Sequence, residues 1–234
     1  MSAMAETMPT GNANARKLKI IHVVGSPVSQ YYSMISIHYA RQMLAGASDE
    51  ETRANFEFAF AVILPGGGWS LISDLAEESI DKAAKLSHGE ALSVLAAADY
   101  DACVPHMFCW PGYTTYRSVF DLLQVPIVGC SAECMALITD KAKTKACASA
   151  CGVSVPEGEL LRSATQVPTV PYPFVLKPCC EDNSMGITKV EGPEELADAM
   201  AIAFKFDSSV VCERFIPLGR EIRVAVVEDD NGEP

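Results

Sequence analysis

Residues 174–190 read FVLKPCCEDNSMGITKV, and this stretch decides how the chain around it folds. Two short apolar runs enclose a polar loop, which is the pattern of a β-hairpin. Pro173 and Pro178 bracket the first run, and Gly186 gives the far end of the loop backbone freedom before a β-branched return strand. The stretch therefore predicts a hairpin whose loop is able to hold a ligand.

Lys177 stands on the first strand of this hairpin, directly before the loop. Asn183, Ser184 and the loop amides offer hydrogen-bond donors near its ammonium, so the segment suits an anion such as a nucleotide phosphate. The alternative is a solvated strand lysine, whose replacement would leave stability almost unchanged. The residues of the hairpin alone leave both interpretations open.

The hairpin resembles the FVxKP…GSSxGISKV segment of D-alanine–D-alanine ligases, members of the ATP-grasp superfamily. Two further stretches are similar to family segments: residues 125–145 to xPyvGS…ALamDKxxtK, and residues 211–226 to VExFIxGxEixVAV, with one residue inserted before Gly219. The resemblance implies an ATP-dependent enzyme that joins a carboxylate to an amine through an acyl phosphate. The rival hypotheses are a non-catalytic nucleotide-binding relative, a ligase for a different amino acid or amine, and, more distantly, a thiol-rich redox or metal protein.

The resemblance also implies which residues bind the nucleotide. Carried over by position, they are Lys141, Lys177, Asn183, Ser184, Gly186, Glu213, Phe215, Ile216 and Glu221. The two lysines would contact phosphates beneath the loop, while Phe215 and Ile216 would form a wall against the adenine. Glu213 and Glu221 would accept hydrogen bonds from the adenine amino group and the ribose hydroxyls. The alternative for these two glutamates is a pair of surface charges at strand edges.

The substrate side departs from the family pattern at two places. Ser29 stands where the family's SAEREVS segment has a glutamate for the incoming amino group, and Gly112 lies where the acidic GEDG motif is expected. His106 lies in the counterpart of the family's His-Gly loop, so Ser29 and His106 are the implied substrate residues, and D-alanine is not expected as the second substrate. The expected cofactors are ATP and Mg²⁺. The family's magnesium ligands would lie beyond residue 234, so no metal ligand and no catalytic residue is predicted within this chain.

Composition excludes several classes of protein. The chain has 234 residues, 49% of them hydrophobic and 21% charged, which is ordinary for a globular protein of one or two domains. A net charge of −12 argues against a nucleic-acid partner. Nine cysteines, an odd number in a chain of this size, indicate reduced thiols. No run has transmembrane length and no secretory signal is present, so the expected compartment is the cytoplasm, with an organelle address left open.

The order of apolar patterns predicts an α/β protein of two parts. A disordered leader at 1–17 precedes a Rossmann-like domain with a parallel sheet at 18–129, and the N-terminal part of an ATP-grasp domain follows at 130–234. Strands are expected at 18–24, 56–64, 100–107 and 125–129, and helices at 33–44, 75–98 with a break at His88-Gly89, 117–123 and 132–151. The segment at 66–68 is expected to be a flexible connection.

The second part is expected to form a small sheet from 174–177, 187–190, 209–216 and 221–227, covered by a helix that begins near Pro193. A turn signal at 229–232 then suggests that the chain ends within its domain, so this fragment is expected to be inactive alone. The unpaired edge at 222–227 favours self-association, for example as a homodimer. The other expected partners are small amino acid substrates, with neither nucleic acid nor membrane.

Overall fold

The computed structural model describes residues 16–226, and this part of the chain divides into two compact units. Unit 1 contains the residues up to Thr144 together with Cys180–Asn183, and unit 2 contains Lys145–Cys179 and the chain from Ser184 onward. The expected leader, apart from its last two residues, and the turn signal at 229–232 lie outside the described residues. Within residues 16–226, no helix has the length and apolar character needed to cross a membrane.

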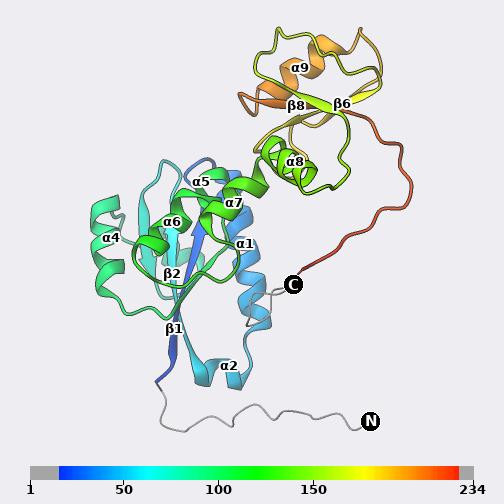
Figure 1. The fold of residues 1–234 in the computed structure, drawn as a ribbon. Coiled ribbons are helices and arrows are strands. Elements are labelled where there is room, and N and C mark those ends of the chain that lie inside the picture. The colour runs from blue at the N-terminus through cyan, green and yellow to red at the C-terminus, as the bar shows by residue number, and fades with distance from the viewer. Residues whose placement is uncertain (1–15, 227–234) are drawn as a thin grey trace, which may run out of the picture. The chain divides into compact units, whose positions relative to one another are not determined.

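Unit 1 is built on a four-stranded sheet in the order β3-β2-β1-β4, of which Figure 1 labels β1 and β2. The central strand β1 (Leu18–Gly25) pairs in parallel with β2 (Phe56–Ile63) and with β4 (Ala102–Pro105). These are three of the predicted strands, and the predicted α/β class is confirmed. The fourth predicted strand, at 125–129, is wrong, because that segment makes only an isolated bridge between Cys103 and Ile127.

The edge strand β3 (Trp69–Ile72) was not predicted. It runs antiparallel to β2, after a turn in which the backbone amide of Leu64 donates a hydrogen bond to the carbonyl of Gly68. The segment at 66–68 is therefore a hairpin turn and not a flexible connection. A four-residue strand that follows three glycines has too few side chains to show the two-residue period by which a strand is predicted.

Different helices cover the two faces of this sheet. α1 (Gln30–Gly46) packs on the face that carries Val24, Phe60 and Val62. On the other face, the ring of Trp69 lies 5.2 Å from that of Tyr116 in α6 (Thr115–Leu122). Figure 1 shows α1 on one side of the sheet and α4 (His88–Ala97) with α6 on the other. Unit 1 is therefore a three-layer α/β arrangement.

Two segments predicted as long helices are each divided. The first forms α3 (Glu77–Lys82) and α4, because Ser87 and Glu90 make a capping box that begins α4. His88-Gly89 therefore opens a helix instead of breaking one. The second forms α7 (Ala132–Thr139) and α8 (Lys141–Ala150), because Asp140 takes an extended conformation and accepts hydrogen bonds from the amides of Ala142 and Lys143. The remaining short helices of unit 1 are α2 (Glu50–Asn55) and α5 (Trp110–Tyr113).

Unit 2 contains an antiparallel sheet in the order β5-β8-β6-β7. The predicted hairpin is confirmed as β6 (Phe174–Pro178) and β7 (Thr188–Val190), and β8 (Val210–Arg214) lies beside β6. The fourth strand is β5 (Gly158–Leu161), not the predicted 221–227. Residues 221–226 are exposed and form no strand, whereas β5 contributes the fully buried Leu161 to the sheet's core; residue 227 lies outside the described part.

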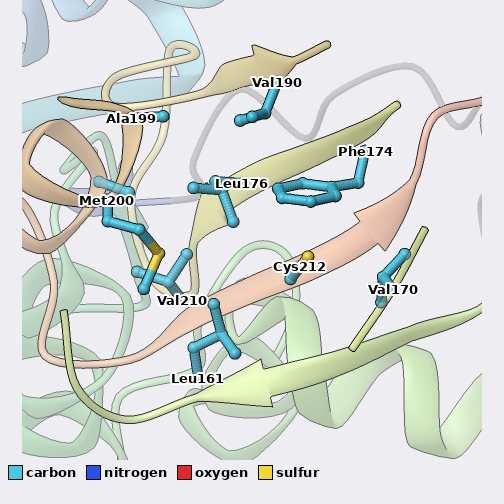
Figure 2. Close-up of a cluster of buried hydrophobic side chains, with 10 residues drawn as sticks. Leu161, Val170, Phe174, Leu176, Val190, Ala199, Met200, Val210 and Cys212 are labelled. Atoms are coloured by element: carbon cyan, nitrogen blue, oxygen red, sulfur yellow. The ribbon is translucent and has the colours of Figure 1, made fainter. Parts of the chain in front are cut away.

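The core of unit 2 lies between this sheet and α9 (Leu196–Phe204). Figure 2 shows Phe174 and Leu176 of β6 beside Val210 and Cys212 of β8, and α9 adds Ala199, Met200 and Ala203 to the same cluster. Since side chains alternate along a strand, the residues between these positions, Val175, Lys177 and Glu213, lie on the opposite face. One face of the sheet is thus apolar and the other carries charge.

Gly25, at the end of β1, is the position in unit 1 where a side chain is least tolerable. Its φ is +91°, and a Cβ there would lie 2.2 Å from the carbonyl oxygen of Ile63. We expect Gly25→Ala to lower the free energy of unfolding by about 3 kcal/mol or more, because backbone strain and a backbone clash act together. Urea denaturation measures this loss.

Gly66→Ala is the matched control. Gly66 has a similar φ of +89°, but nothing lies within 4 Å of the position of its Cβ. Only the conformational cost remains there, about 1 kcal/mol. Equal losses in the two variants would show that the contact with Ile63 does not constrain Gly25.

Candidate functional site

The first group of candidate residues lies where β1 and β4 end. The two strands are adjacent and parallel, so the segments that leave their carboxyl ends meet at one edge of the sheet, where open α/β sheets bind ligands. Ser26 follows β1 and donates a hydrogen bond of 3.3 Å to the thiol of Cys109, which follows β4. The structure therefore places the predicted substrate residues Ser29 and His106 on segments that start from the same edge.

Ser29 is the N-cap of α1, and its hydroxyl oxygen accepts a hydrogen bond from the amide of Tyr32. This explains why a small hydroxyl residue suits the position. His106 donates its backbone amide to the carbonyl of Val23, which fixes the start of the segment after β4. Both residues are thus held by the fold before any ligand arrives.

His22 was predicted only as part of a buried strand, and it proves to be the partner of His106. Its Nδ1 lies 3.0 Å from Nε2 of His106, and the two rings stack with their centroids 5.2 Å apart. His22 is 1% exposed, and its Nε2 is buried without a hydrogen-bond partner. Burial, followed by the effect of His106, lowers the pKa of His22 to about 4, and burial also lowers the pKa of His106.

Two tyrosines hold the part of the hairpin loop that belongs to unit 1. The hydroxyl of Tyr32 donates to the carboxylate of Glu181 at 2.6 Å, and that of Tyr113 donates to Asp182 at 2.9 Å. Burial and then the neighbouring carboxylate raise the pKa of both phenols, so each stays a donor at neutral pH. Neither tyrosine was predicted. The signal was that both lie in the segments that depart from the family pattern, close to Ser29 and Gly112.

Lys141 and Asn183, both predicted to bind ATP, lie in unit 1. The ammonium of Lys141 donates to the backbone carbonyl of Glu181 at 2.5 Å. Asn183 has a φ of +52° and borders a groove of about 720 Å³ along α1, together with Tyr31 and Met34. Neither Ser29 nor His106 lines this groove, which begins at Gln30, the residue after Ser29.

The second group of candidate residues lies on the charged face of the unit 2 sheet. Glu213 is 7% exposed, and its two carboxylate oxygens each accept from a different lysine. Lys177, diagonally across from it on β6, bonds one oxygen, and Lys145 from α8 bonds the other at 2.7 Å. We call these three residues the lysine–glutamate cluster. The sequence predicted two of its members and missed Lys145. The available signal was its spacing, because a residue four positions after Lys141 lies on the same side of a helix.

The charges of the cluster do not cancel. Burial opposes ionisation of Glu213, but the hydrogen bonds from Lys145 and Lys177 outweigh it, so the pKa of this carboxyl lies below its ordinary value. Two ammonium groups then face one carboxylate, which leaves a local positive charge in a chain whose net charge is −12. The alternative of a solvated strand lysine is wrong for Lys177, because its side chain is only 30% exposed and is ion-paired.

The end of the hairpin loop is confirmed as a site that needs glycine. Gly186 has a φ of +73°, and a Cβ there would lie 2.7 Å from both Phe206 and Pro178. Ser184, two residues earlier, also has a positive φ, of +59°. The loop is therefore a tight turn whose backbone comes close to the core of unit 2, and Gly186 is a structural requirement of the hairpin.

The other predicted nucleotide residues, Phe215, Ile216 and Glu221, make no described contact with the lysine–glutamate cluster. Phe215 follows β8 and has the ammonium of Lys189 3.9 Å above its ring, a cation–π contact. Ile216 is 57% exposed, and Glu221 lies on an exposed segment 3.6 Å from Arg223. No described contact joins Glu221 to the lysine–glutamate cluster. None of the nine cysteines forms a disulfide bond, and no group of three or more metal-ligating side chains occurs among residues 16–226.

Comparison with known proteins points to a single family. The family profile described as D-ala D-ala ligase C-terminus matches residues 157–234. A D-alanine–D-alanine ligase of Prosthecochloris aestuarii is 33% identical over an alignment of 169 residues, which covers 68% of this chain and 41% of that protein. The chain belongs to the D-alanine–D-alanine ligase family of the ATP-grasp superfamily. It spans about two fifths of the length of the curated relatives that it matches.

Solved structures share the fold of this family member. The VanG D-Ala:D-Ser ligase of Enterococcus faecalis matches with a TM-score of 0.67 and 22% identity, over 86% of this chain and 63% of that one. The D-alanine–D-alanine ligase of Bacillus anthracis, solved in complex with ATP, matches with a TM-score of 0.62 and 19% identity, over 86% of this chain and 58% of that one. The predicted fold is thus that of the family.

The lysine–glutamate cluster makes a direct prediction about stability. We expect Glu213→Gln to lower the free energy of unfolding of unit 2 by about 2–3 kcal/mol at pH 7, because two partly buried ammonium groups would lose the carboxylate between them. Glu191→Gln, at the exposed pair of Glu191 with Lys189, should cost less than about 0.5 kcal/mol. Urea denaturation of both variants checks this, and a similar small loss in both would contradict the cluster's ion pairing.

The pair of histidines predicts a dependence of stability on pH. His22 has a pKa of about 4 in the folded chain against an ordinary value of 6.5, so the unfolded chain binds a proton at His22 more readily than the folded chain does. The free energy of unfolding is therefore unaffected by this group above pH 6.5 and decreases as the pH falls from 6.5 toward 4. Between pH 7 and pH 5 the loss should be about 2 kcal/mol. His22→Phe removes this titration, so its free energy of unfolding should fall less over the same interval. Equal slopes for the two proteins would contradict the lowered pKa.

Proposed function

We propose that this chain carries part of the ATP site of a carboxylate–amine ligase. ATP would phosphorylate a substrate carboxylate, the amine would attack the resulting acyl phosphate, and ADP and inorganic phosphate would leave as the new C–N bond forms. The observation that carries the proposal is the net positive lysine–glutamate cluster, which the family's own sequence segments build on the face of the sheet that does not pack against α9.

The cluster fits nucleotide phosphates for a physical reason. Lys145 and Lys177 are already desolvated in part, with side chains 22% and 30% exposed, and Glu213 holds both ammonium groups on one face of the sheet. Charge-assisted hydrogen bonds from such groups to phosphate oxygens are stronger than those between neutral groups. We therefore add Lys145 to the predicted set of ATP residues, in which Lys141 and Lys177 contact phosphates and Ser184 and Gly186 belong to the loop over them.

Magnesium is proposed as the partner of the nucleotide. Among residues 16–226, no group of three ligating side chains could hold a metal ion. We propose that the ion is carried by the phosphate oxygens, which are hard ligands of the kind that Mg²⁺ prefers. What this chain supplies is the positive charge of the two lysines.

For the substrate side, we propose small amino acids, with Ser29 and His106 near the reacting groups. Ser29 is neutral and its oxygen already caps α1, so it cannot replace a carboxylate that binds an ammonium group. A desolvated ammonium that lacks this partner loses about 1.5–3 kcal/mol. We therefore propose that the amine substrate is not D-alanine, in line with a relative of the same fold that is a D-Ala:D-Ser ligase.

The test of the nucleotide site is the stabilisation that Mg-ATP confers on the chain. We expect Lys177→Met and Lys145→Met each to remove most of the ATP-induced rise in melting temperature, because one lost charge-assisted hydrogen bond weakens binding by about ten- to a hundredfold. Both variants should also be less stable without ligand, since each leaves Glu213 with one partner.

Lys205→Met is the matched control, because Lys205 is an exposed lysine of unit 2 at the end of α9. It should keep the full ATP-induced shift. If Lys177→Met and Lys145→Met kept theirs as well, the cluster would not be the phosphate site. ADP formation with an amino acid and Mg²⁺ supplied would favour the ligase over the alternative, a non-catalytic nucleotide-binding relative, and would contradict the expectation that this fragment is inactive alone.

A further inference from the structure

His22 is a costly residue for its position. It lies in the middle of β1, on the face covered by α1. The ring of Phe60 stacks on its imidazole with the centroids 5.3 Å apart, and the ring of Phe58 makes a T-shaped contact with a centroid distance of 5.1 Å. An apolar side chain would fill this place without leaving the buried Nε2 unpaired. The one strong polar contact described for the His22 side chain is the 3.0 Å bond to His106, so that bond is the reason to look for a role.

The proton in this bond can be assigned from the surroundings. Both rings are neutral near pH 7, because burial lowers the pKa of each and His106 is the only titratable group that acts on His22 among the described residues. If His106 donated, the proton of His22 would lie on Nε2, buried against rings that offer at most a weak π acceptor. Orphaned buried N–H groups are rare. His22 therefore carries its proton on Nδ1 and donates it to Nε2 of His106.

This assignment determines what His106 offers to a ligand. With its Nε2 engaged as an acceptor, a neutral His106 carries its own proton on Nδ1. No described residue bonds that atom, and His106 is only half-buried, at the edge where Ser26 and Cys109 also meet. The free group at this edge is thus an N–H donor.

We propose that His22 is a positioning residue that locks His106 in the Nδ1–H tautomer, so that His106 presents a hydrogen-bond donor to an anionic oxygen. The ligand that we assign to this donor is a carboxylate, whose oxygens can only accept at that position; a phosphate oxygen shares this property, and the titration below separates the two. Identification of the carboxylate as that of an amino acid substrate rests on the proposed ligase function, whereas the tautomer does not.

The tautomer is read directly by imidazole ¹⁵N NMR of the uniformly labelled chain at pH 7. The expected result is a protonated Nδ1 on both rings and a bare Nε2 on both. A proton on Nε2 of His22, or a cationic ring in either residue, would overturn the assignment. This readout does not respond to a merely structural role of His22.

Two variants separate donation from packing. His22→Asn keeps an N–H group close to the place of Nδ1, so His106 should retain its Nδ1 proton. His22→Phe fills the space without a donor, so His106 should show a mixture with Nε2–H. If the two variants gave the same His106 spectrum, the locking role would be refuted. The wild-type and Asn spectra suffice if the Phe variant does not fold.

The ligand is tested by titration with acetate, as the simplest carboxylate, and with inorganic phosphate. Acetate should shift the Nδ1 resonance of His106, with about tenfold weaker binding in His22→Phe and less than threefold weaker binding in His22→Asn. A response to phosphate alone would overturn the carboxylate assignment and keep the donor. If neither anion shifts the resonance and the tautomer is as stated, His106 has no carboxylate-binding role, and the substrate part of the proposed function is wrong. ATP binding at Lys177 is tested independently of this result.

Discussion

A carboxylate buried to 7% exposure needs partners, and Glu213 finds them in two lysines from different elements of unit 2. One lysine comes from β6 and the other from α8. The need of Glu213 for two cationic partners therefore holds α8 against the face of the sheet that carries β6 and β8. The two-residue period of β6 and β8 makes this possible, since Phe174, Leu176, Val210 and Cys212 take the apolar face and leave Lys177 and Glu213 on the other. The alternation of side chains along β6 and β8 therefore produces both the apolar core of unit 2 and the charged face that carries the lysine–glutamate cluster.

The parts of the fold that could be predicted are those with a strong local pattern. The long apolar run of β1 and the bracketed run of β6 gave the right strands, since burial on one or both faces leaves a periodic record in the sequence. β3 and β5 were missed because a four-residue strand is too short to show a clear alternation of apolar and polar residues. β5 also pairs with β8, which lies about 50 residues later in the sequence. The helix boundaries at Ser87 and Asp140 depended on caps that a few polar residues make, which a count of apolar positions overlooks.

The candidate site shows the same division. Lys177 and Gly186 were found because they lie inside the hairpin that the sequence defines, and the turn geometry confirms the need for glycine. Lys145, Tyr32 and His22 were missed because their role is a contact with a residue far along the chain: Glu213, Glu181 and His106 respectively. A single sequence records which side chains are polar, but it does not record which polar side chains meet. His22 is the clearest case, because a histidine inside an apolar strand is a local conflict that only its tertiary partner resolves.

The ion pairing of the cluster also sets a condition on how an anion binds there. Both carboxylate oxygens of Glu213 are occupied by the lysines, so a phosphate that reaches Lys145 or Lys177 must share or replace these hydrogen bonds. An exchange of this kind costs less than desolvation of a free ammonium, because the lysine side chains are already partly removed from water. It also leaves Glu213 free to accept from another donor, and the exocyclic amino group of adenine is such a donor. The proposed role of Glu213 and its observed ion pairs are therefore compatible as two states of one carboxylate: in the proposed complex with ATP, the lysines would pass from Glu213 to phosphate.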